Sequence, residues 1–195
     1  MNYVLMDTKR FPDKEAVKAQ RDDLIRADLS RMDLSRIELR GANLSYADLS
    51  YADLSSAKLD GAILPDANLS GAKLSYGNFS GANLSRSDLS FADLSYAKLA
   101  GAIVPDANLA HAKLNDGDFS DANFSDANFS RANLNRANFT KASLNGANFS
   151  GAFMEQVILH DASLTAADFS RAYVFYNICE DYCKKCETVL NLFFP

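Results

Sequence analysis

The chain has 195 residues, of which 48% are hydrophobic and 23% charged, and it carries a formal net charge of -5 with a pI near 5.0. This acidic balance argues against a general nucleic-acid binder and against a polybasic membrane-surface protein, and the apolar share is too high for a disordered chain. No run approaches the roughly 18 apolar residues of a membrane span, and the apolar run 4–6 is too short for a secretory signal. We therefore expect one soluble, cytoplasmic protein that binds neither membranes nor nucleic acid directly.

Residues 1–21 precede the main pattern of the chain. The segment 11–20 predicts a short helix, because a proline such as Pro12 is favourable near a helix start. We expect this helix, with the apolar residues 4–6, to cover the first turn of the structure that follows. Residues 1–21 are thus predicted to form an N-terminal cap.

A five-residue period begins at Leu24. A large apolar residue, mostly Leu or Phe, occupies every fifth position up to Val174, in 31 consecutive units. A small residue, usually Ala, lies two positions earlier; Asp or Asn usually lies between the two, and Ser often follows. Two inward residues in five fit neither a helix nor an alternating strand, and they predict a short extended piece followed by a corner. Asp and Asn suit such corners, because their side chains bond nearby backbone N–H groups.

A longer internal repeat gives the size of one coil. Residues 57–77 match residues 97–117 at 15 of 21 positions, an offset of 40 residues or eight units. Eight units divide into coils of two or four, and a two-unit coil would leave no interior. We therefore predict a solenoid with 20 residues per coil over 22–176, in about 7.5 coils spaced by about 4.8 Å.

The recurring pattern Ala-(Asp/Asn)-Leu-Ser, as in residues 47–50, resembles the pentapeptide-repeat family over about 150 of the 195 residues. The resemblance implies an all-β fold, a right-handed quadrilateral β-helix with the large and small apolar residues pointing inward. Together with the terminal segments, the prediction is a β-helix with short helical caps at the N- and C-termini.

Residues 177–195 break the period and are predicted to form an amphipathic helix. This helix either caps the last coil or joins two copies of the chain, since some members of the family dimerise through a C-terminal helix. The residues expected at that contact are Leu190, Phe193 and Phe194.

Three cysteines fall in the same C-terminal segment: Cys179, Cys183 and Cys186. Their thiolates could hold zinc or an iron–sulfur cluster, or form a redox disulfide. On a helix, however, this spacing is an apolar stripe, and free cysteine often behaves as a small buried hydrophobe. We favour burial, and we predict no metal and no cofactor.

The outward positions carry charges and aromatic rings. Folded every 20 residues, they predict mixed-sign ladders between coils, such as Asp33, Asp53, Lys73, Asp93 and Lys113 on one face and Glu38, Lys58, Asn78, Lys98 and Asp118 on the next. Exposed stacked aromatics can bind a partner, and we expect an aromatic corner ladder of Tyr46, Tyr51, Tyr76, Phe91 and Tyr96. The strongest acidic cluster is Asp106, Asp116, Asp118, Asp121 and Asp126.

Signs of catalysis are weak. His111 and His160 both fall in outward positions, no nucleophile elbow is present, and a straight rod offers no cleft that excludes water. Pro65 and Pro105 cannot donate to a ladder and are expected at corners or edges. We predict that the protein is not an enzyme.

Three functions remain as hypotheses. The first is a non-enzymatic scaffold that binds a protein partner through its outer faces. The second is implied by the resemblance: some family members mimic duplex DNA and bind DNA gyrase and other type II topoisomerases, with carboxylates in place of phosphates. Residues 24–175 carry 17 acidic and 13 basic residues, a weak excess for such a mimic. The third is a metal or redox protein that uses the C-terminal cysteines.

Overall fold

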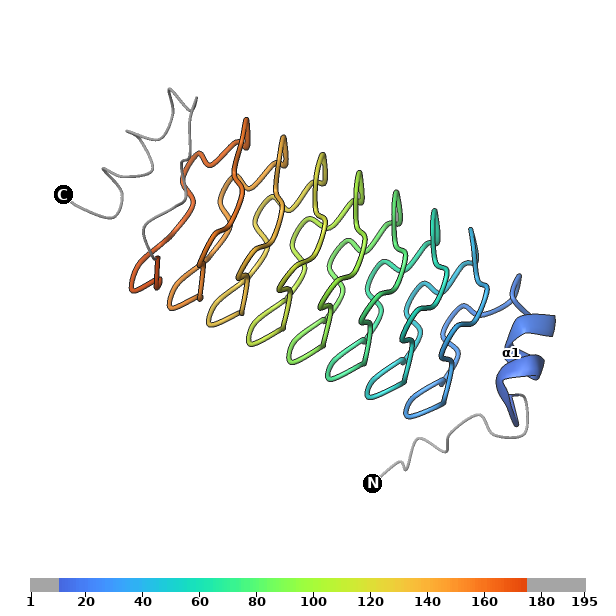
Figure 1. The fold of residues 1–195 in the computed structure, drawn as a ribbon. Helices are drawn as coiled ribbons and strands as arrows, with labels where there is room; N and C mark the ends of the chain where they lie inside the picture. Colours follow the sequence, from blue (N-terminus) through green and yellow to red (C-terminus); the bar gives the residue numbers. More distant parts are fainter. Residues whose placement is uncertain (1–10, 175–195) are drawn as a thin grey trace.

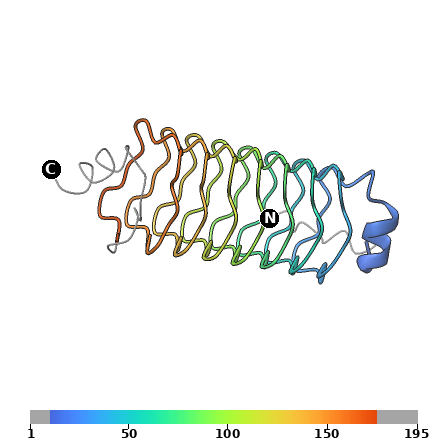
Figure 2. The ribbon, with the colours of Figure 1, turned by 45° about the horizontal axis from the view of Figure 1, so that its top comes forward.

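The protein is a rod of stacked, four-cornered coils with one short helix at the N-terminal end (Figure 1). The structure is a computed structural model, and it describes residues 11–174. Seen after a turn of 45°, the coils remain aligned one behind another along the rod (Figure 2). The predicted C-terminal helix and its cysteines lie outside the described residues.

Each coil contains 20 residues, as predicted. Parallel bridges join each residue that precedes a large apolar residue to its counterpart 20 positions on, from Asp28↔Asp48 to Phe153↔Tyr173. The straight pieces are so short that each contributes a single bridged residue, and no strand longer than this isolated bridge occurs among residues 11–174. The sheet-like faces are therefore built across coils rather than along the chain.

The corners are tight turns of one kind. At the first, the Ala27 backbone N–H donates to the Leu24 carbonyl at 3.1 Å, and Arg26 between them has a φ of 58°. A positive φ at the third residue of a turn is characteristic of type II. This positive φ recurs at every fifth residue from Arg26 to Arg171, whether the residue is Gly or carries a side chain. The left-handed conformation is thus imposed by the coil and not by glycine.

Hydrogen bonding explains why Asp and Asn recur. Within one unit, four backbone N–H groups bond to backbone carbonyls, as at Ala27, Leu29 and Arg31. The remaining N–H belongs to the residue after the large apolar one, and it donates to the Asp or Asn side chain two positions earlier, as Ser30 does to Asp28 at 3.1 Å. The predicted bond to a nearby N–H is confirmed, but the Asp or Asn lies on the face just before the corner, not in it.

The two prolines follow the same logic. Pro65 and Pro105 are the second residues of their turns, a position that proline favours. Both come two positions after isoleucine, Ile63 and Ile103, in the slot where Asp or Asn usually stands. Isoleucine cannot accept a hydrogen bond, and proline has no N–H that needs one. The predicted corner position of the prolines is therefore confirmed.

The interior is a continuous apolar column. The large apolar residues from Leu24 to Phe169 are buried, apart from the partly buried Leu164, and so are nearly all the alanines two positions before them. Towards the C-terminal end the column becomes aromatic: Phe129 and Phe149 stack with ring centroids 5.0 Å apart, and Phe149 stacks on Phe169 at 4.9 Å.

Helix α1 spans Lys14–Ala19 at the N-terminal end of the rod (Figure 1). It begins later than the predicted segment 11–20, because the Asp13 side chain accepts from the Ala16 N–H at 2.9 Å and fixes the start of the helix. Phe11, before the helix, is buried, as is Val17. The Lys14 ammonium donates to the Ser35 carbonyl at 2.8 Å and ties α1 to the coils.

Candidate interaction surface

The outer surface has four faces and four corners, each stacked at 20-residue intervals. The alternating face consists of Asp33, Asp53, Lys73, Asp93, Lys113, Asn133, Phe153 and Tyr173, stacked by the parallel bridges. In chain order it is entered from the Tyr51 corner, which contains Arg31, Tyr51, Gly71, Phe91, His111 and Arg131. It is left through the Tyr76 corner, which contains Arg36, Ser56, Tyr76, Tyr96, Asp116 and Arg136.

The other faces differ in chemistry. The amide face stacks Asp28, Asp48, Asn68, Asp88, Asn108, Asn128, Asn148 and Asp168 and carries no basic residue. The Lys58 face stacks Glu38, Lys58, Asn78, Lys98, Asp118, Asn138 and Ile158, and the Ile63 face stacks Asn43, Ile63, Asn83, Ile103, Asn123, Ser143 and Ser163.

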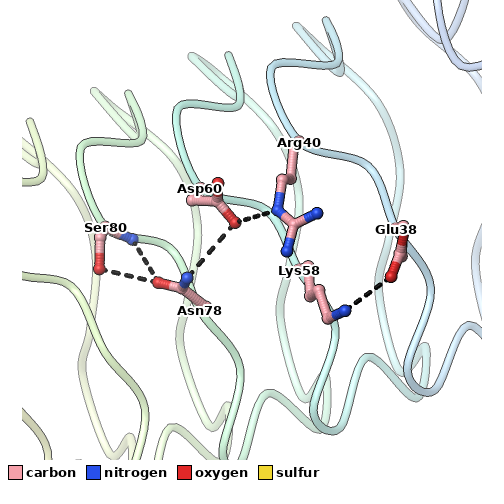
Figure 3. A network of polar contacts seen from close by, with 6 residues as sticks. All are labelled: Glu38, Arg40, Lys58, Asp60, Asn78 and Ser80. Carbon is pink, nitrogen blue, oxygen red and sulfur yellow. Dashed lines mark hydrogen bonds and ion pairs between the residues drawn. The ribbon is translucent and has the colours of Figure 1, made fainter.

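The predicted ion pairs between neighbouring coils are present. On the Lys58 face the Lys58 ammonium lies 2.6 Å from the Glu38 carboxylate, and beside it Arg40 lies 3.0 Å from Asp60, which also accepts a hydrogen bond from the Asn78 amide (Figure 3). On the alternating face, Lys73 and Lys113 lie 3.6 and 3.8 Å from Asp53 and Asp93. These pairs are exposed and contribute little to stability individually.

The tightest pair lies on the Tyr76 corner. Arg136 donates two hydrogen bonds to Asp116, at 2.6 and 2.7 Å, from one coil to the next. Hydrogen bonds from Arg136 and then from Asn115 lower the pKa of the Asp116 carboxyl to about 2. A similar pair, Arg86 with Asp66, lowers the pKa of Asp66 chiefly through its hydrogen bond.

The five predicted aromatic candidates are exposed, but they do not form one ladder. Tyr46 lies on a corner of its own, Tyr51 and Phe91 lie two coils apart on the Tyr51 corner, and Tyr76 and Tyr96 share the Tyr76 corner. The rings of Tyr76 and Tyr96 stack with centroids 4.9 Å apart. The single-corner prediction is wrong. Two residues share a corner only if they are separated by a whole number of 20-residue coils, and residues 46, 51 and 76 are not.

The five acidic candidates are also separated. Asp106 and Asp126 are neighbours on one corner, whereas Asp121 lies on a second corner and Asp118 on the Lys58 face. Asp116 lies on the Tyr76 corner, where Arg136 neutralises its charge. The structure therefore does not bring the five carboxylates together as one cluster.

Both histidines lie on the exposed surface, as predicted. His111 stacks on Phe91 with centroids 4.8 Å apart, and His160 lies 3.3 Å from Asp161 on the exposed surface. Within residues 11–174, no group of three His, Cys, Asp or Glu residues could hold a metal ion. In the same part of the chain, no helix has the length and apolar character needed to cross a bilayer. Leu190, Phe193, Phe194 and the cysteine group lie beyond it.

Sequence reasoning missed one exposed aromatic pair. Phe153 and Tyr173 stack at 4.9 Å on the alternating face, in a slot that elsewhere holds Asp, Asn or Lys. Ile63 and Ile103, on another face, were likewise not recognised as exposed apolar residues. Arranging all outward slots, and not only the charged ones, at 20-residue intervals would have revealed both pairs.

Comparisons with known proteins agree with this architecture. The family described as Pentapeptide repeats matches in eight copies, over residues 23–61, 52–90, 67–104, 87–126, 105–140 and 137–173. No curated protein matches the sequence.

Similar solved structures are also pentapeptide repeat proteins. HetL, involved in heterocyst differentiation regulation in the cyanobacterium Nostoc sp. strain PCC 7120, is 28% identical with a TM-score of 0.51, covering 82% of this chain and 92% of its own. A protein of the Arabidopsis thaliana thylakoid lumen is 28% identical with a TM-score of 0.42, covering 62% of this chain and 74% of its own. QnrB1, a plasmid-mediated fluoroquinolone resistance protein, is 18% identical with a TM-score of 0.44, covering 74% of this chain and 89% of its own. The match to the family model extends over the whole coiled region, and the chain therefore belongs to the pentapeptide repeat family.

Proposed function

We propose that the protein is a non-enzymatic scaffold that binds a protein partner through its outer faces. The observation that supports this most directly is the filled interior: the inward residues of the coils form an apolar column. Chemistry is therefore confined to the outside, where charged side chains and eleven exposed large apolar side chains are described. Exposed aromatics and arginine are the residue types that protein interfaces favour. The similarity to HetL, a protein involved in regulation, is consistent with a binding role.

The partner-binding candidates fall into two sets that can be tested separately. The aromatic set is Tyr46, Tyr51, Tyr76, Phe91 and Tyr96, and the acidic set is Asp106, Asp116, Asp118, Asp121 and Asp126. The immobilised protein is exposed to extract of its native host, alongside variants Tyr46→Ser/Tyr51→Ser and Asp118→Lys/Asp121→Lys. The control is Asn83→Ser/Asn123→Ser, which changes small polar residues on the Ile63 face. A stoichiometric partner that the wild type and the control retain and one variant loses supports the proposal. Capture of no partner by the wild type contradicts it.

The gyrase-binding alternative gains nothing from the placement of the acids, which lie on three corners and one face. This alternative predicts that increasing amounts of the protein change gyrase supercoiling, with or without a quinolone. Unchanged supercoiling in both assays would rule out gyrase binding.

The third alternative, a metal or redox protein, predicts stoichiometric zinc or iron in the purified chain. The cytoplasmic location and the lack of direct nucleic-acid binding also remain predictions from the composition.

A further inference from the structure

We propose that the alternating face and its two flanking corners bind a second copy of the same chain, with the two rods antiparallel. This inference goes beyond the proposed scaffold function and does not depend on it. It starts from the order of charges along the face, which reads Asp53, Lys73, Asp93, Lys113 over four successive coils.

This order is complementary to its own reverse. A two-fold axis that runs across the face, between the coils of Lys73 and Asp93, reverses the direction of the second rod. It places Lys73 of each copy opposite Asp93 of the other, and Asp53 opposite Lys113. A two-fold interface repeats every contact twice, so four oppositely charged pairs form. Parallel rods in register would instead place Asp53 against Asp53 and Lys73 against Lys73.

The other faces have this property to a lesser degree or not at all. The amide face carries only Asp and Asn, so two copies of it repel or remain neutral. The Ile63 face carries no charge in its bridged positions. On the Lys58 face the same axis brings Lys58 opposite Asp118 but leaves Lys98 opposite the neutral Asn78, so only two oppositely charged pairs form instead of four. Electrostatic complementarity determines orientation and suppresses wrong partners more than it adds affinity.

With the same axis, the Tyr76 corner adds apolar surface to the contact between the two copies. Because the axis runs across the face, each corner meets its own counterpart in the second copy. Tyr76 of one rod then lies opposite Tyr96 of the other, so two stacked pairs of rings face each other. Tyr76 is 62% exposed and Tyr96 44%, so both have surface to bury.

The Tyr51 corner supplies a second aromatic contact. Gly71 has no side chain, and the ring of Tyr51 from the preceding coil lies across it: a Cβ on Gly71 would be 2.6 Å from that ring. The axis brings Phe91 of the second copy level with Gly71, so the Phe91 ring meets the Tyr51 ring. Phe91 is 67% exposed and Tyr51 63%. Buried aromatic contacts of this kind supply most of the energy of an interface.

Like charges lie only beyond the central pairs. The same register places Arg31 opposite Arg131 on the Tyr51 corner, and Arg36 opposite Arg136 on the Tyr76 corner. Arg136 is already paired with Asp116 of its own chain. From Asp33 to Asn133 the strip covers six coils, or roughly 24 Å at about 4.8 Å per coil. The arginines therefore belong to its ends, where solvent and salt screen them.

The test measures the mass of the purified full-length chain by sedimentation over about 1 µM to 1 mM, a range that corresponds to weak to moderate association. We expect a reversible dimer. Lys73→Glu/Lys113→Glu makes the strip acidic and Asp53→Lys/Asp93→Lys makes it basic, and each variant alone should dimerise at least about tenfold more weakly. Mixed in equal amounts, the two variants should recover a heterodimer. Circular dichroism checks that each variant keeps the folded structure of the rod.

Lys58→Glu/Lys98→Glu is the matched control, since it makes the same change of charge at the same two-coil spacing on the adjacent face. It should dimerise like the wild type. A wild type that stays monomeric at 1 mM overturns the proposal. So does a dimer that survives in Lys73→Glu/Lys113→Glu, because the contact then lies elsewhere, as in the C-terminal segment. Equal loss in the control also overturns it, because net charge would then be the cause.

Cysteine cross-linking tests the orientation. With Cys179, Cys183 and Cys186 replaced by Ser, the variant Ser55→Cys is mixed with Asn115→Cys. Antiparallel rods place these two positions opposite each other at the edge of the alternating face, so a disulfide should form in the mixture and in neither variant alone. Cross-linking of Ser55→Cys with itself would contradict the antiparallel arrangement.

Discussion

Arg136 binds Asp116 of the preceding coil on the Tyr76 corner through two hydrogen bonds. Its Nε donates to one carboxylate oxygen at 2.6 Å, and an η nitrogen donates to the other at 2.7 Å. Such a two-point hydrogen bond stabilises the charged form of the carboxylate. It therefore holds the pKa of Asp116 at about 2, against an ordinary value of 3.8. The stabilisation by this pair is complete above the ordinary pKa and is lost as the pH falls through about 2.

The first prediction concerns that carboxyl group. In Arg136→Gln we expect the pKa of Asp116 to rise towards its ordinary value, because the first cause of the shift is removed while the Asn115 bond remains. A carboxyl-carbon NMR titration measures it directly. Arg131→Gln, on the Tyr51 corner, is the control and should leave the Asp116 pKa unchanged. If the pKa of Asp116 in Arg136→Gln is the same as in the wild type, the pair between Arg136 and Asp116 does not form in solution.

The second prediction concerns the glycine two positions before Phe79. A Cβ on Gly77 would lie 2.6 Å from Cε2 of the Phe79 ring, so the ring fills the place of the usual alanine. The same relationship holds between Gly117 and Phe119 at 2.5 Å. Gly77→Ala should therefore overpack the core and lower the free energy of unfolding by about 1–3 kcal/mol.

A second substitution separates overpacking from a backbone effect. Gly77→Ala/Phe79→Leu recreates the Ala-x-Leu unit found at residues 57–59. In urea unfolding, the double variant should lose less stability than the sum of the two single variants, since the smaller leucine leaves space that the alanine methyl group fills. Additive losses would show that the glycine serves another purpose.

The third prediction concerns the pairing of isoleucine with proline at residues 63–65. Pro65→Ser introduces an N–H that Ile63 cannot accept from, so the variant should lose about 0.5–1.5 kcal/mol of stability. Ile63→Asn/Pro65→Ser supplies the side-chain acceptor that other units use, as in Ser45 with Asn43 at 3.1 Å. Chemical denaturation of both variants measures the coupling. Equal stability of Pro65→Ser and the double variant would refute this explanation of the prolines.

The regularity of the repeat is what made the fold predictable. The large apolar slot from Leu24 onward, and the 40-residue offset between Lys73 and Lys113, were enough to give the four-sided coil and its vertical columns. These features follow from local geometry that every unit repeats, so one rule applies along the whole rod.

The surface was less predictable, because it depends on which corner a residue occupies. Tyr46, Tyr51 and Tyr76 look equivalent along the sequence, since each follows a Ser after a large apolar residue. They nevertheless fall on three different corners. The start of α1 also depends on one side chain, Asp13, which accepts a hydrogen bond from the Ala16 N–H. Asp13 lies before the five-residue repeat, so the repeat does not predict this bond.

The last prediction tests how far stability is shared along the rod. Leu54 is fully buried and packs in a column with the large residues 20 positions before and after it, Leu34 and Leu74. Leu54→Ala should lower the free energy of unfolding by about 2–5 kcal/mol, since it removes packed atoms and leaves a cavity. In a repeat array each unit contacts only its neighbours. Amide hydrogen exchange should therefore become faster near Leu34 and Leu74 than near Leu134, four coils from the substitution. Uniformly faster exchange at all positions would instead show that the whole rod unfolds as one cooperative unit.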